Sequence, residues 1–98
     1  MSEAIKDFVS SGALAANNGS NDVTPLTFAG GVWTAGSNVA VGTNPYGVAI
    51  SPDGLRALAA NAGSSNVTPL TFASGVWTAG SNVAVGSNPH IGIVIYSQ

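Results

Sequence analysis

Residues 23–46 read VTPLTFAGGVWTAGSNVAVGTNPY, and residues 67–90 read VTPLTFASGVWTAGSNVAVGSNPH. The second segment follows the first by 44 residues and differs from it at three positions. The similarity extends upstream, because ALAAN at residues 13–17 recurs at residues 57–61. A period of this length is typical of stacked or circular repeat folds, in which one unit cannot bury its apolar face alone. The differing pairs are Gly30/Ser74, Thr43/Ser87 and Tyr46/His90.

The composition limits the classes of protein that this chain can represent. With 98 residues, 45% hydrophobic and 6% charged, it has room for one small domain whose surface is too apolar to face water alone. No Cys is present, so disulfides are excluded. A net charge of −2 without a basic patch argues against nucleic acid as a partner. We expect no signal peptide and no membrane-spanning segment, and the compartment stays open.

Short β-rich runs separated by Gly, Asn, Ser and Pro predict an all-β fold. One complete unit contains four expected strands, and Pro52, Asp53 and Gly54 form a tight turn between the first two. Four antiparallel strands in a repeat of this length describe a β-propeller blade. The expected strands cover residues 46–51, 55–61, 66–73 and 76–85, the last interrupted near Gly80.

Pro25 and Pro69 occupy equivalent positions inside the third strand of each unit. Proline has no N–H to donate to a ladder, so it is restricted to edges and bulges. We therefore expect either a bulge at this position or a proline whose nitrogen faces an edge of the sheet, where no N–H is needed.

Residues 44–54 (NPYGVAISPDG), Ala60-Asn61 and residues 66–70 (NVTPL) resemble the YVTN-type β-propeller repeat. The resemblance covers most of the chain and implies a propeller fold. It implies little about function, because such propellers are mostly binding or surface proteins, often exported. The chain departs from the pattern at Leu58-Ala59 and in its two Trp residues. It also has two units where a full-length member has about seven blades.

The order of the expected strands along the chain predicts that copies of the chain assemble with one another. We interpret residues 1–98 as a single propeller module: 1–12 an extension, 13–43 strands two to four of the first blade, 44–86 a complete second blade, and 87–98 a spare first strand. That strand would complete the split blade of a neighbouring copy. The expected ring is a homotrimer of six blades, with a homotetramer as the alternative and a four-bladed dimer as a strained possibility. In a second interpretation, residues 6–10 supply the missing strand. The exchanged strand comprises Gly92, Ile93, Val94, Ile95 and Tyr96.

The chain has few groups that could perform chemistry. His90 is its one His, and no nucleophile–base pair or repeated carboxylate pair is visible. Asp53 lies in a turn where Asp is favoured for backbone hydrogen bonding, and Asp22 stands where the other repeat has Asn66. We therefore expect no enzyme, no metal site and no cofactor.

Trp33 and Trp77 are the best candidates for a ligand site, because an indole face fits the apolar face of a sugar ring. The alternative is that each Trp packs between adjacent blades. Tyr46 and His90 are equivalent to each other, at the entry to the first strand of a blade. The leading hypothesis is a non-catalytic structural or interaction module that self-assembles, and its low divergence is typical of recent duplication or of engineering. The alternative is a multivalent, lectin-like carbohydrate-binding protein.

Overall fold

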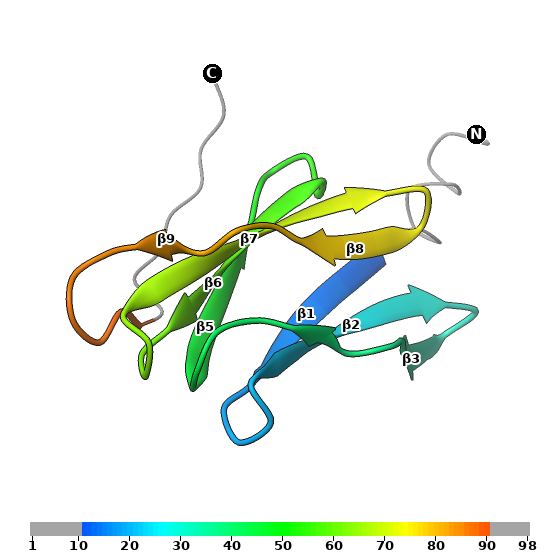
Figure 1. Ribbon diagram of the computed structural model, residues 1–98. Coiled ribbons are helices and arrows are strands. Elements are labelled where there is room, and N and C mark those ends of the chain that lie inside the picture. The colour runs from blue at the N-terminus through cyan, green and yellow to red at the C-terminus, as the bar shows by residue number, and fades with distance from the viewer. Residues whose placement is uncertain (1–10, 91–98) are drawn as a thin grey trace.

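The computed structural model describes residues 11–90, which form nine β-strands in two antiparallel sheets (Figure 1). The prediction of an all-β fold is confirmed, and these residues contain no helix and form no closed ring. Nothing in this range could therefore cross a membrane as an apolar helix. Sheet 1 contains β1 (Ser11–Asn17), β2 (Asp22–Ala29), β3 (Val32–Ala35) and β4 (Val39–Ala40); sheet 2 contains β5 (Pro45–Ile50), β6 (Arg56–Asn61), β7 (Asn66–Ala73), β8 (Val76–Ala79) and β9 (Val83–Ala84).

The sequence repeat is a structural repeat with the same strand register. Leu14 is opposite Pro25 in sheet 1, as Leu58 is opposite Pro69 in sheet 2. Strands β6 to β9 thus correspond to β1 to β4, and the break predicted near Gly80 separates β8 from β9. Strand β5 has no counterpart in sheet 1 among residues 11–90. The predicted exchanged strand, 92–96, and the alternative strand, 6–10, lie outside the described residues.

The repeated prolines face the break in the fourth strand. The register between β1 and β2 runs through Pro25 without a shift, so β2 itself has no bulge. Pro25 does not lie at a sheet edge either, because β2 pairs with β1 on one side and with β3 and β4 on the other. Gly36 N donates to Pro25 O (2.7 Å), which shows that the polar groups of Pro25 point toward β3 and β4. Because β3 ends at Ala35 and β4 begins at Val39, the ladder requires no N–H from this proline.

The two sheets pack face to face over a small aliphatic core. Its buried residues are Val23 from sheet 1 and Ala57, Ala59 and Leu70 from sheet 2. The two alanines let the sheets approach closely. Since strand residues alternate between faces, each sheet uses one face for this contact and leaves the other pointing away. Six partly buried residues extend the core: Leu14, Val39, Val41, Val48, Trp77 and Ala79.

Candidate functional site

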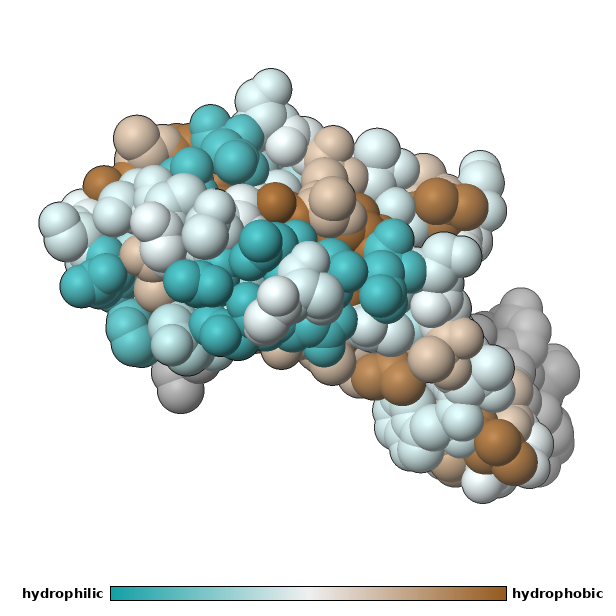
Figure 2. All heavy atoms as spheres, turned by 60° about the horizontal axis from the view of Figure 1, so that its bottom comes forward, coloured by the Kyte–Doolittle hydropathy of each residue, from teal (hydrophilic) through white to brown (hydrophobic). Residues whose placement is uncertain are grey.

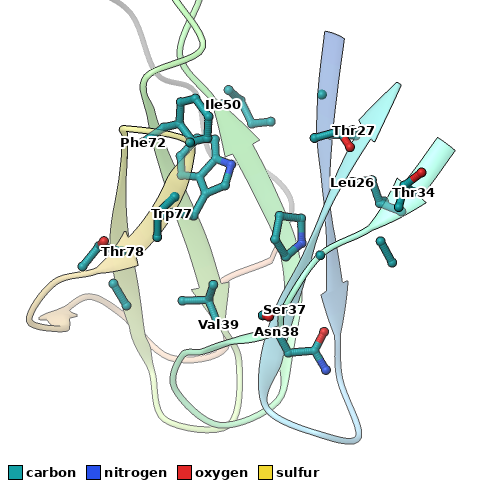
Figure 3. Close-up of a pocket in the computed structure, with 18 of the residues that line it drawn as sticks. Leu26, Thr27, Thr34, Ser37, Asn38, Val39, Ile50, Phe72, Trp77 and Thr78 are labelled. Carbon is teal, nitrogen blue, oxygen red and sulfur yellow. The ribbon is translucent and has the colours of Figure 1, made fainter. Parts of the chain in front are cut away.

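A groove of about 870 Å³ opens between the two sheets beside the core. Figure 3 shows Thr27 and Thr34 on the sheet 1 side, and Phe72 and Trp77 on the sheet 2 side. The groove combines an aromatic wall with threonine hydroxyl groups. That combination suits a ligand with both apolar and polar faces. Ser37, Asn38 and Thr78 also line the groove, but the Thr78 side chain lies on the face of β8 opposite Trp77.

Trp77 has a packing role as well as a place in this groove. It lies opposite Phe72 in the β7–β8 ladder, with ring centroids 5.1 Å apart. The indole is half-buried and packs against the core that joins the sheets. This position agrees with the predicted alternative in which the Trp packs between sheets, while one side remains open to the groove.

Trp33 has the same local structure in a different environment. It lies opposite Phe28, again at 5.1 Å, so the two aromatic pairs are nearly identical. However, strand alternation places Trp33 on the face of sheet 1 opposite Val23, away from sheet 2. The Trp33 side chain is 53% exposed. The two Trp residues are therefore equivalent in sequence but not in surroundings.

Tyr46 and His90 form a separate aromatic pair. Their rings stack in parallel with centroids 5.1 Å apart and an interplanar angle of 4°. Tyr46 is about half exposed, and neither ring lines the groove of Trp77. The structure thus places the four predicted ligand residues in three locations and does not bring them together into one site.

A cluster of amides and hydroxyls at the β6–β7 turn was not predicted from the sequence. Asn61 is fully buried, and its Nδ2 donates to Asn66 Oδ1 and to Thr68 Oγ1, both at 2.9 Å. Thr68 Oγ1 in turn donates to Asn82 Oδ1 (2.6 Å). The linker between the sheets lies on this cluster, with Thr43 N donating to Ser64 Oγ (3.1 Å). The signal for it was the recurrence of these polar residues with the repeat.

Sheet 1 carries the same cluster at the β1–β2 turn, in a more open form. Asn17 Nδ2 donates to Thr24 Oγ1 (2.7 Å), and Thr24 Oγ1 donates to Asn38 Oδ1 (2.6 Å). Asn17 and Thr24 are half-buried, whereas their counterparts in sheet 2 are fully buried. Hydrophilic residues gather along one side of the molecule in Figure 2, the side toward which these turns point in Figure 1.

Both aspartates of the described residues act as hydrogen-bond acceptors in turns. Donation from Ser20 and Asn17 holds the pKa of Asp22 below its ordinary value of 3.8. Donation from Ser51 Oγ (2.6 Å) and Leu55 N (2.9 Å) lowers the pKa of Asp53 in the same way. The prediction that Asp53 accepts a backbone hydrogen bond in its turn is therefore confirmed. Residues 11–90 contain no group of three or more side chains suited to holding a metal ion.

No protein-family model and no curated protein matches this chain. Among solved structures it is similar to the crystal structure of a functionally unknown protein from Desulfotomaculum acetoxidans DSM 771, with a TM-score of 0.69 and 22% sequence identity. The match covers 80% of this chain and spans 29% of the length of the other. At this identity the similarity concerns the fold alone.

The two aspartates predict how stability depends on pH. Their folded-state pKa values lie below those of the unfolded chain, so they stabilise the fold above about pH 4, and this contribution is lost as the pH falls through the folded-state values. The unfolding midpoint of Asp53→Asn should therefore fall less than that of the wild type between about pH 5 and about pH 2.

Asp22→Asn is the matched second variant, because it reproduces the residue found at position 66. It should also flatten the pH profile. Profiles parallel to that of the wild type in both variants would contradict the role assigned to these hydrogen bonds.

Proposed function

We propose that this chain is a non-catalytic interaction module that assembles with copies of itself into a propeller-like ring. The observation that carries the proposal is that equivalent residues of the two repeats are buried to different extents. Equivalent apolar side chains in two repeats with the same local fold should be buried to the same extent. Where one copy is covered and the other is open, the open copy marks a surface that lacks its neighbour.

The first such surface is the Trp33 face of sheet 1. Leu70 is 1% exposed because sheet 1 covers it, whereas its counterpart Leu26 is only half-buried. Trp77 is half-buried in the core contact, whereas Trp33 is exposed. We define the Trp33 face as Ala13, Ala15, Leu26, Trp33 and Ala35, which correspond to the covered residues Ala57, Ala59, Leu70, Trp77 and Ala79.

The second surface is the Val83 face of sheet 2, which is the face of that sheet opposite its contact with sheet 1. Val39 and Val41 pack against the core, whereas their counterparts Val83 and Val85 are 54% and 43% exposed. Val23 is fully buried, and its counterpart Val67 is half-buried. We define the Val83 face as Leu58, Val67, Val83 and Val85, which correspond to Leu14, Val23, Val39 and Val41.

The two open faces are the two halves of the contact that already exists inside the chain. The Val83 face of one copy therefore has the chemistry and shape to cover the Trp33 face of the next. Such a head-to-tail contact extends until it closes into a ring. Propellers contain about four to eight blades, so three copies giving six blades is the favoured closure and four copies giving eight is the alternative. The strand exchange proposed for residues 92–96 would strengthen the same contact.

Association in solution tests this proposal. The mass of the wild-type chain, measured by native mass spectrometry or light scattering, should be an integer multiple of 9.6 kDa, with three copies favoured. Val83→Asp should reduce the mass to that of one chain, because it places a charge in the contact. A folded wild-type chain that stays single up to high concentration would contradict the proposal.

Val76→Asp is the matched control for Val83→Asp. Val76 is 58% exposed, yet its counterpart Val32 remains 60% exposed on the covered face of sheet 1. This repeat position therefore faces solvent whether or not a neighbouring sheet is present. Val76→Asp should leave the mass of the assembly unchanged.

A lectin-like function is the second candidate, and the groove beside Trp77 favours it. The Trp77 indole and the threonines Thr27 and Thr34 line the same groove, and sugar binding uses such a combination of aromatic face and hydroxyl groups. Trp33 would acquire an equivalent groove only when a second copy covers its face. Each copy in a ring would then carry two sites, and multivalency would raise a weak affinity.

Tryptophan fluorescence during titration with a panel of monosaccharides and oligosaccharides tests this candidate. A saturable change in emission that is lost in Trp77→Phe and Trp33→Phe together would support sugar binding. Emission that does not respond to any member of the panel would leave the interaction module without a sugar ligand.

A further inference from the structure

The two sheets are joined by a close polar contact in addition to their apolar core. The linker between β4 and β5 lies across the β6–β7 turn, where Gly42 N donates to Thr68 Oγ1 (3.3 Å) and Thr43 N donates to Ser64 Oγ (3.1 Å). In return, Gly63 N donates to Thr43 O (2.9 Å). We call this contact between residues 42–44 and the β6–β7 turn the glycine clasp.

The glycine clasp leaves no room for a side chain on either half. A Cβ added at Gly42 would lie 2.6 Å from Asn61 Nδ2 and 2.7 Å from Ser64 Oγ. A Cβ added at Gly63 would lie 2.8 Å from Thr43 Cγ2. Neither glycine has a left-handed φ, so close approach and not backbone conformation is the reason for glycine at these positions.

Both halves of the glycine clasp recur in the chain without a partner among residues 11–90. Gly86 corresponds to Gly42 and Gly19 corresponds to Gly63, yet a Cβ at either would meet nothing within 4 Å in this range. Neither Gly86 nor Gly19 has a left-handed φ. Within the described part of one chain, then, neither position has a conformational or a steric need for glycine.

The receiving half on sheet 1 is already arranged for the contact. The hydrogen bonds from Asn17 to Thr24 (2.7 Å) and from Thr24 to Asn38 (2.6 Å) repeat those from Asn61 to Thr68 (2.9 Å) and from Thr68 to Asn82 (2.6 Å). Such an arrangement costs little further ordering when a partner arrives. Ser20 stands where Ser64 accepts the backbone N–H of Thr43.

On the basis of the proposed self-assembly, we propose that residues 86–88 of a second copy close a glycine clasp on the β1–β2 turn of the first. In this contact Gly86 N of the second copy donates to Thr24 Oγ1, and its Ser87 N donates to Ser20 Oγ. The change from Thr43 to Ser87 keeps the backbone donor, and Gly19 receives the linker as Gly63 does. The clasp fixes the register of the apolar faces, because its polar pairs form in only one alignment.

Single alanine substitutions test the clasp. The new Cβ of Gly86→Ala or Gly19→Ala meets none of residues 11–90 of its own chain, so the unfolding midpoints at low concentration should equal that of the wild type. Each should raise the dissociation constant of the assembly at least tenfold, measured by analytical ultracentrifugation, because its Cβ would clash across the interface. Ser81→Ala is the matched control: Ser81 and its counterpart Ser37 are both exposed, so association should not change.

Mixing the two variants tests the head-to-tail geometry. Each variant alone lacks one half of every contact, whereas a Gly19→Ala copy can offer an intact Gly86 to a Gly86→Ala copy with an intact Gly19. At a concentration where each variant alone stays single, an equimolar mixture should therefore form a heterodimer. Failure of the mixture to associate would overturn the proposed pairing of Gly86 with Gly19.

The outcomes separate the clasp from the proposed function. An assembled wild type whose affinity is unchanged by Gly86→Ala and by Gly19→Ala would overturn the clasp and leave self-assembly standing. A wild type that stays single would overturn both. If Gly86→Ala then lowered the unfolding midpoint of that single chain, Gly86 would serve packing within the chain and not between copies.

Discussion

The face-to-face packing of the two sheets is the contact on which the rest of the structure depends. A four-residue buried core carries it, and two of those residues, Ala57 and Ala59, are small enough to bring the sheets close. A chain of this size buries limited apolar surface. The outer face of each sheet carries the apolar residue types that the other sheet uses in the internal contact. The internal contact is therefore both the main source of tertiary stability and a template for further contacts.

Comparison of the two repeats predicts how copies of the chain associate. Because Val83 and Trp33 belong to units with nearly the same sequence and register, each open face has a covered counterpart that shows what it would bind. Inside the chain, the face of sheet 2 that corresponds to the Trp33 face is covered by sheet 1. The residues of sheet 1 that cover it correspond to those of the Val83 face. The same comparison extends to the polar glycine clasp, where Gly42 is enclosed and Gly86 is open. Apolar area supplies affinity in such a contact, and hydrogen bonds between defined partners supply register.

Much of the fold could be predicted from the sequence. The period, the short β-rich runs and the turn residues between them located the strands of sheet 2 and the break near Gly80, because these signals are local. For Pro25 the sequence predicted a bulge or an edge, whereas the structure shows a break in the neighbouring strand, since sequence spacing does not tell which side of a strand faces a gap. The propeller ring and the YVTN-type resemblance stay predictions for the assembled protein.

The candidate site was harder to predict, because two identical segments give identical signals. Sequence could not distinguish Trp33 from Trp77, since their difference lies in whether another sheet covers them. It also missed the cluster around Asn61, because Asn, Ser and Thr near turns usually indicate surface loops. Tyr46 and His90 were grouped with the Trp residues by their chemistry, but the structure places them in a separate stack.

Acrylamide quenching of single-tryptophan variants tests the central claim most directly. Trp77→Phe reports on Trp33 alone, and Trp33→Phe reports on Trp77 alone. At a concentration where the chain is single, Trp33 should be quenched more strongly than Trp77, as their exposures require. As the chain assembles, quenching of Trp33 should fall to the level of Trp77. Quenching of Trp33 that stays constant while the mass of the assembly increases would contradict the account, because copies would then associate through some other surface.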